Sequence, residues 1–343
     1  MPFKSAAALS LRADGLDVVL NDDGKPRTTF VSAAAPPASS DGPAAGYAVP
    51  CASAGEHVFC PDHTGAVHRA ARDGSGDRLV ASSRAGSHVT AALVGGTHAT
   101  FAYLASRQTS EGWVSEAWIG VDDDAPVRLS EDGSGATAVT LVARGSSVLA
   151  MSVDARAALT AMHARPVAFD GGHLKLGEDA VVFVGGPGDR RTAGTVVVPS
   201  SGPAWGLLPI AKDAATFGLA IVRIDEPPRV DEPVAWSTYA NGLDPAPIVA
   251  AAWGATTWVA RVLPREASVG SARDLELGII EPSGDFALAS TVPTTSSRPG
   301  DLALAADAQG ALWLAWVDAG GSWVEKLQCT APAAPASLQA RDH

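Results

Sequence analysis

The chain has 343 residues, of which 46% are hydrophobic and 18% charged, with 35 Gly and 24 Pro. This composition indicates a folded chain rich in turns and argues against an intrinsically disordered protein. The formal net charge of −12 argues against nucleic acid as a partner, and no apolar stretch is long enough to insert into a membrane.

One phrase recurs along the chain: a short alternating strand, a tight turn that usually contains Gly, and a second strand rich in Val, Leu, Trp or Ala. The turns lie roughly 49 residues apart on average, which falls within the propeller-blade range of about 40–50 residues. The seven copies begin at Ala7, Tyr47, Val89, Val139, Leu207, Ile248 and Leu302.

Further strands between the copies, such as Trp113–Val121 followed by Val127–Ser130, bring each unit to about four strands. Such units bury their faces only by stacking around an axis. We therefore predict an all-β fold, a single β-propeller of seven four-stranded blades over residues 1–329, followed by a flexible C-terminal tail at 330–343.

The last copy ends after its third strand, so we expect the N-terminal residues Pro2–Ala6 to supply the outer strand that closes the last blade. The interval before the Leu207 copy is unusually long. It leaves two alternatives open, a six-bladed ring with an irregular N-terminal extension and a pair of β-sandwiches.

The segment ADAQGALWLAWVDAGG at Ala306–Gly321 resembles the D-x-x-G-x-x-x-[VLA]-x-W phrase of sialidase-like and related propellers. The resemblance implies that Asp307 and Gly310 form a hairpin turn and that Trp316 packs between blades. It supports the β-propeller superfamily and no specific family within it, so no catalytic role is carried over.

Two cysteines fall on one predicted hairpin. A two-residue turn at Gly55-Glu56 would place Cys51 opposite Cys60, close enough for a disulfide. The alternative is two buried thiols, which we favour because the N-terminus lacks a signal peptide and predicts a cytoplasmic protein. An extracytoplasmic location applies if the native N-terminus lies upstream.

The loops after each second strand and the loops between blades gather on one face of a propeller, where ligands usually bind. Arg and Asp side chains there would suit a sugar or a carboxylate. Each Asp is also a favoured turn-former, which is the interpretation we prefer. The candidate ligand-binding residues are Asp62, His63, Arg84, His88, Asp154, Arg190, Arg191, Arg298 and Asp318.

The remaining motifs predict no cofactor and no metal. The histidines do not show the convergence that a metal site needs and are interpreted as surface or turn residues. GGPGDRR at Gly185–Arg191 lacks the following helix of a phosphate loop. The Pro-rich segment Ile224–Val234 is a candidate loop for a partner protein, through Asp225, Glu226, Arg229, Asp231 and Glu232.

We therefore expect a non-catalytic propeller that binds a partner protein or a polar ligand, such as a glycan, through one face of the ring. The alternative is a glycan-active hydrolase or lyase with Asp62, Asp154 or Asp318 as acid and base. Paired carboxyl groups with raised pKa values in a deep pocket would favour the enzyme. A structural subunit of a larger assembly is a third interpretation.

Overall fold

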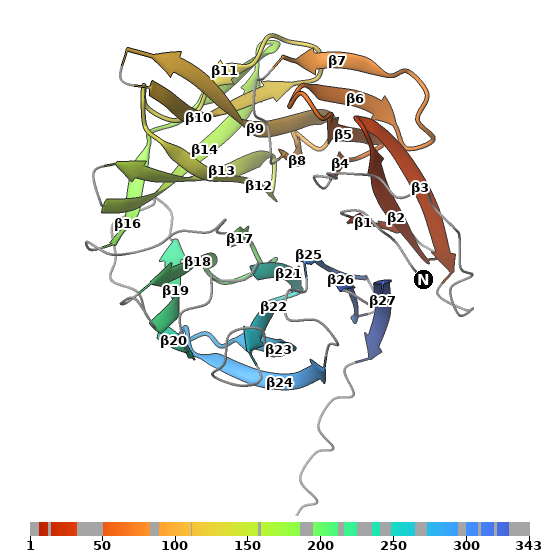
Figure 1. The fold of residues 1–343 in the computed structure, drawn as a ribbon, viewed down its shortest axis with the longest axis vertical. Coiled ribbons are helices and arrows are strands. Elements are labelled where there is room, and N and C mark those ends of the chain that lie inside the picture. Colours follow the sequence, from red (N-terminus) through yellow and green to blue (C-terminus); the bar gives the residue numbers. More distant parts are fainter. Residues whose placement is uncertain are drawn as a thin grey trace, which may run out of the picture.

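The computed structural model describes residues 7–12, 15–32, 51–82, 89–110, 112–156, 159–185, 195–211, 216–224, 235–240, 248–264, 273–293, 300–307, 310–318 and 321–328. These residues form antiparallel strands and the turns between them, in seven sheets that surround a common centre (Figure 1). Within the described part of the chain, no helix is long and apolar enough to cross a membrane.

The sheets follow one another in chain order, and we number them as blades I to VII. Blade I comprises β1 (Ala7–Arg12), β2 (Gly15–Asp22) and β3 (Lys25–Ser32). Blade II comprises β4 (Ala52–Ala54), β5 (His57–Pro61), β6 (Val67–Ala71) and β7 (Arg78–Ala81). Blade III comprises β8 (Val89–Val94), β9 (His98–Thr109), β10 (Gly112–Val121) and β11 (Val127–Arg128). Blade IV comprises β12 (Ala136–Arg144), β13 (Ser147–Arg156), β14 (Leu159–Asp170) and β15 (His173–Leu176), and β16 (Ala180–Gly185) also pairs with β14.

The last three blades continue the pattern. Blade V comprises β17 (Thr195–Val197), β18 (Ala204–Ala211), β19 (Thr216–Ile224) and β20 (Ala235–Ala240). Blade VI comprises β21 (Ile248–Trp253), β22 (Thr256–Pro264), β23 (Arg273–Ile280) and β24 (Phe286–Pro293). Blade VII comprises β25 (Gly300–Ala306), β26 (Ala311–Asp318) and β27 (Gly321–Gln328).

The first strand of each blade lies next to the first strands of both neighbouring blades, and β25 of the last blade contacts β1 of the first. The ring is therefore closed, and the prediction of a seven-bladed β-propeller is confirmed. The six-bladed ring and the pair of sandwiches are wrong. Blades I and VII show three strands among the described residues. The predicted closing strand Pro2–Ala6 and the tail at 330–343 lie outside those residues.

Blade V corrects the predicted phase of the repeat. The hairpin that begins at Leu207 is not the first hairpin of its blade, because it joins β18 to β19, the second and third strands. The first strand, β17, has only three residues, whereas β18 and β19 are longer and strongly apolar, so their hairpin dominates the sequence pattern of the blade. This misassignment explains the long interval before the Leu207 copy.

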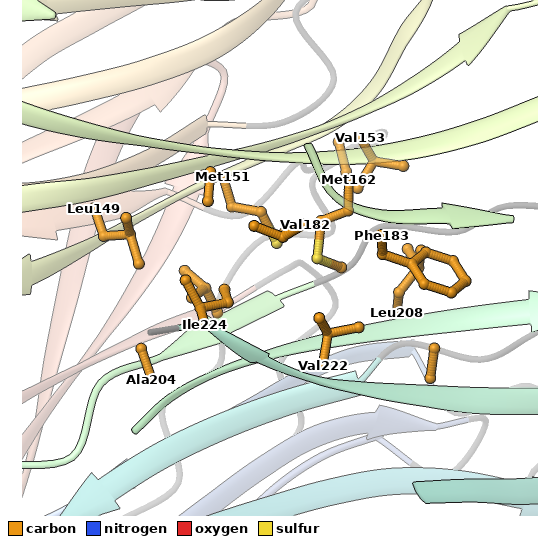
Figure 2. Packing of buried hydrophobic residues seen from close by; sticks show 14 residues of the cluster. Leu149, Met151, Val153, Met162, Val182, Phe183, Ala204, Leu208, Val222 and Ile224 are labelled. Carbon is orange, nitrogen blue, oxygen red and sulfur yellow. The ribbon is translucent and has the colours of Figure 1, made fainter. Parts of the chain in front are cut away.

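The core consists of apolar layers between neighbouring blades. Between blades IV and V, Met151, Met162 and Phe183 point toward Leu208 and Val222 (Figure 2). Burying each such side chain contributes about 1.5–3 kcal/mol, so the packing between blades holds the ring together. The turns and connections at the two ends of the strands form the two faces of the ring.

Blade II contains the predicted cysteine pair. Ala52 pairs with Phe59 and Ala54 with His57, so the turn is Gly55–Glu56 as expected. The same register places Cys51 opposite Cys60, with Cα atoms 4.4 Å apart, and a disulfide joins them. The preferred expectation of two thiols is therefore wrong, because a pair this close lies within bonding reach.

Candidate binding face

Antiparallel blades place the ends of all their second strands on one face of the ring, which we call the site face. It carries the turn Asp23–Gly24 of blade I, the turn Asp62–Ala66 of blade II and the connection Leu129–Gly135 from blade III to blade IV. The opposite face carries the turns between first and second strands, such as Gly55–Glu56.

A histidine–aspartate pair links blades I and II on the site face. Asp23 Oδ1 accepts hydrogen bonds from the backbone N–H of His63 and lies 2.8 Å from its Nδ1. The backbone hydrogen bond and then the imidazole lower the pKa of Asp23, and the Asp23 side chain in turn raises the pKa of His63. The His63 side chain is 72% exposed. His63 is thus a surface turn residue, as predicted, and it is held in place by its neighbouring blade.

Asp62 is a turn-former. Its Oδ1 accepts hydrogen bonds from the backbone N–H groups of Thr64 and Ala66 and from the Thr64 hydroxyl, and Oδ2 lies 3.4 Å from His68 Nε2. Burial alone would raise the pKa of Asp62, but these hydrogen bonds outweigh it and lower the pKa. A carboxylate engaged in this way closes the turn between β5 and β6.

Blade III holds a buried carboxylate under two arginines. Glu116 is 1% exposed, and its Oε1 lies 2.9 Å from Arg107 Nη2 and 3.6 Å from Arg128 Nη1, while the backbone N–H of Gly133 donates at 3.1 Å. Asp132 also pairs with both arginines. Burial alone would raise the pKa of Glu116, but the Arg107 and Gly133 hydrogen bonds hold it below its usual value.

The strands that carry this cluster form a projecting hairpin. β8 pairs with β9 only as far as Tyr103, and β11 pairs with β10 only at Trp118 and Ile119. The remainder of the β9–β10 hairpin therefore extends beyond its neighbouring strands, toward the site face. Trp113 lies near its tip and is 58% exposed. It pairs with Gln108, whereas Arg107 pairs with Val114, so the Trp113 and Arg107 side chains lie on opposite sides of the hairpin.

In blade IV, a histidine is enclosed between two aspartates. His163 on β14 has Nδ1 2.9 Å from Asp179 Oδ2 and Nε2 3.7 Å from Asp154 Oδ2. Its side chain is 13% exposed, so its interpretation as a surface or turn residue is wrong. The hydrogen bond to Asp179 outweighs burial and raises the pKa of His163, with Asp154 and Glu131 adding to the effect. His163 is thus held by two carboxylates of its own blade, near Glu131 of the connection from blade III.

Among the described candidates, the side chains of Asp62 and Asp154 lie in separate places. The contacts of Asp62 lie within blade II and those of Asp154 with His163 lie within blade IV, with blade III between them. Asp318 is the last residue of β26 and pairs with Gly321. The other candidates lie outside the described residues: Arg84, His88, Arg190, Arg191, Arg298, Asp225, Glu226, Arg229, Asp231 and Glu232.

Sequence reasoning missed Arg107, Glu116, Arg128 and Asp132. One signal was present, because Glu116 interrupts the apolar strand Trp113–Val121 at a position where a buried charge requires a partner. The partners could not be named, since they come from β9, β11 and the connection that follows. For metals, no group of three His, Cys, Asp or Glu side chains in the described ranges could hold an ion.

No family model matches this chain, and no curated protein matches it. Similar solved structures include U3-55K, at 12% identity over 93% of this chain and 90% of that chain, and the WD40 repeats of RRP9, at 13% over 93% and 88%. A protein of unknown function from Dyadobacter fermentans matches at 10% over 94% of both chains. The TM-score is 0.54 in each case. The chain shares the β-propeller fold with all three. At these identities the likeness is one of fold alone.

Proposed function

We propose that this propeller is a non-catalytic binding module that docks a partner protein on its site face, with the tip of the β9–β10 hairpin at the centre of the contact. The observations that carry the proposal are an exposed Trp113 near the tip of the hairpin and, on the opposite side of the sheet, Arg107 and Arg128, which the buried Glu116 holds in place. Trp and Arg are the residues most enriched among the energetic hot spots of protein interfaces.

Preorganisation supports this role. A free arginine loses side-chain freedom when it docks, at a cost of about 0.5–1.5 kcal/mol. Arg107 and Arg128 are already held by Glu116 and Asp132, while roughly half of each side chain stays exposed. Their remaining N–H groups can donate to a partner with much of that cost already met. The hairpin also projects past its neighbouring strands, which makes its tip accessible to a large partner.

The described carboxyl groups whose pKa values are shifted do not favour the hydrolase alternative. A glycosidase needs one carboxylic acid with a raised pKa, to protonate the leaving group. Five described carboxyl groups, among them the candidate Asp62, have lowered pKa values, because hydrogen bonds to the charged form outweigh burial. These groups are Asp23, Asp62, Asp73, Glu116 and Asp170.

The disulfide bears on location. Bridges such as Cys51–Cys60 persist in oxidising compartments and are rare in the cytosol. It therefore supports an extracytoplasmic site of action, rather than the cytoplasmic location expected from the N-terminal sequence.

The proposal is tested with Trp113→Ser, Arg107→Ser and the matched control Trp253→Ser. Trp253 is also exposed, at 43%, but lies on the opposite face at the turn between β21 and β22. Each protein is immobilised and exposed to extract of the source organism. Proteins kept by the wild type and the control but lost by Trp113→Ser are identified, purified and titrated by calorimetry.

We expect each site-face substitution to weaken binding of the purified partner by about tenfold or more, as hot-spot residues do, and Trp253→Ser to leave it unchanged. Far-UV circular dichroism checks that the variants fold. Binding that depends on Trp253 instead of Trp113 would overturn the proposal. So would a glycan-array signal that requires Trp113 in the absence of any protein partner, which would assign the face to sugars.

A further inference from the structure

A second candidate site lies on the opposite face, independent of the binding face proposed above. A groove of about 260 Å³ separates the turn between β10 and β11 of blade III from the start of β15 in blade IV. It is lined by Val121, Asp124, Ala125, Val127, His173 and Leu174. Four of the six lining residues are aliphatic, and one carboxylate and one imidazole complete the lining.

The three consecutive aspartates of this turn differ in their partners. Asp122 Oδ2 lies 2.8 Å from His98 Nδ1, and Asp123 pairs with Arg69 at 2.7 Å and with Arg78 at 2.8 Å. Asp124 is exposed and has no ion-pair partner among the described residues. Of the three aspartates, Asp124 lines the groove, and it is the one without an ion-pair partner in the described part of the chain.

The size and chemistry of the groove define its occupant. Sites for whole small molecules usually enclose about 300–1,000 Å³, so a groove below that range suits one long side chain better. Lys and Arg side chains lay their aliphatic stems on apolar surface and keep the charged head outside. Val127 and Leu174 offer such a surface, and Asp124 offers the matching negative charge at its end.

We infer that this groove binds a long basic side chain, an ammonium or guanidinium on an aliphatic stem, presented by a partner protein. The stem lies between Val127 and Leu174, and the cationic head pairs with the Asp124 carboxylate. The propeller then offers two separate contact surfaces on opposite faces of blades III and IV.

The test uses n-hexylammonium as the probe and n-hexanol, of equal length and without charge, as its control. Binding is followed by NMR on the methyl groups of Val127 and Leu174 and on the His173 ring. We expect saturable shifts confined to these residues, with a dissociation constant on the order of 10 mM and weaker binding of hexanol.

Asp124→Asn should weaken binding of hexylammonium about two- to fivefold, which is the scale of an exposed ion pair. The matched variant Asp285→Asn, in the corresponding turn of blade VI, should leave it unchanged. Equal binding of hexylammonium and hexanol, with no effect of Asp124→Asn, would show a merely apolar surface and overturn the inference. Shifts centred elsewhere on the protein would overturn it as well.

Discussion

Replacing Gly310 with Ala tests how tightly blades VI and VII are packed. Gly310 has φ +84°, and a Cβ there would lie 2.6–2.8 Å from three ring atoms of Trp253, the last residue of β21. An L-residue in this left-handed region costs about 1–2 kcal/mol. Crowding the indole adds about 1–3 kcal/mol. Together the two contributions amount to about 2–5 kcal/mol. Since Trp253 is partly exposed and can shift, we expect the free energy of unfolding to fall by about 2–4 kcal/mol.

Gly254 provides the matched control. It occupies the equivalent turn of blade VI with φ +58°, and a Cβ there meets nothing within 4 Å. Gly254→Ala should therefore cost only the backbone contribution, about 1–2 kcal/mol. Equilibrium urea unfolding of both variants gives the comparison. In a Trp253→Ala background the extra cost of Gly310→Ala should vanish, with a coupling energy of about 1 kcal/mol or more. Equal costs for the two glycines, or no coupling to Trp253, would refute the reasoning.

Three further predictions follow from buried or bonded groups. Glu116→Ala should lower the free energy of unfolding by about 2–3 kcal/mol. Breaking a fully buried ion pair costs about 3–5 kcal/mol, and the loss here is smaller because the two arginine partners are partly exposed. An unchanged urea midpoint would contradict this prediction. His163 has a pKa raised above 6.5, so its charge stabilises the fold fully below about pH 6.5 and this contribution is lost as pH rises through the folded-state pKa. The stability gap between wild type and His163→Gln should therefore narrow with rising pH, and a constant gap from about pH 5 to 9 would contradict this. The double substitution Cys51→Ala, Cys60→Ala removes a bridge between residues nine apart, and it should lower the free energy of unfolding by about 2–3 kcal/mol. The wild type in reductant should unfold at the same urea concentration as this variant.

The parts of the fold that are local in sequence could be predicted. A tight turn such as Gly55–Glu56 sets which residues face each other across a hairpin, so the opposition of Cys51 and Cys60 followed from the sequence. Asp62 was correctly interpreted as a turn-former for the same reason, since its hydrogen-bond partners lie two and four residues away. Whether the cysteines were bonded was misjudged, because that inference rested on the N-terminal segment and not on the hairpin.

The composition and the repeated hairpin by themselves determined an all-β ring with about seven blades, because strand alternation and turn spacing are written into neighbouring residues. Only the tertiary structure decided where blade V begins, since its short first strand β17 is recognised by its position against β12 and β21. Only the tertiary structure placed Glu116 beneath Arg107 and Arg128, and His163 between Asp154 and Asp179. These contacts join strands and loops that lie apart in the sequence, and the energy of a buried charge depends on what surrounds it in space.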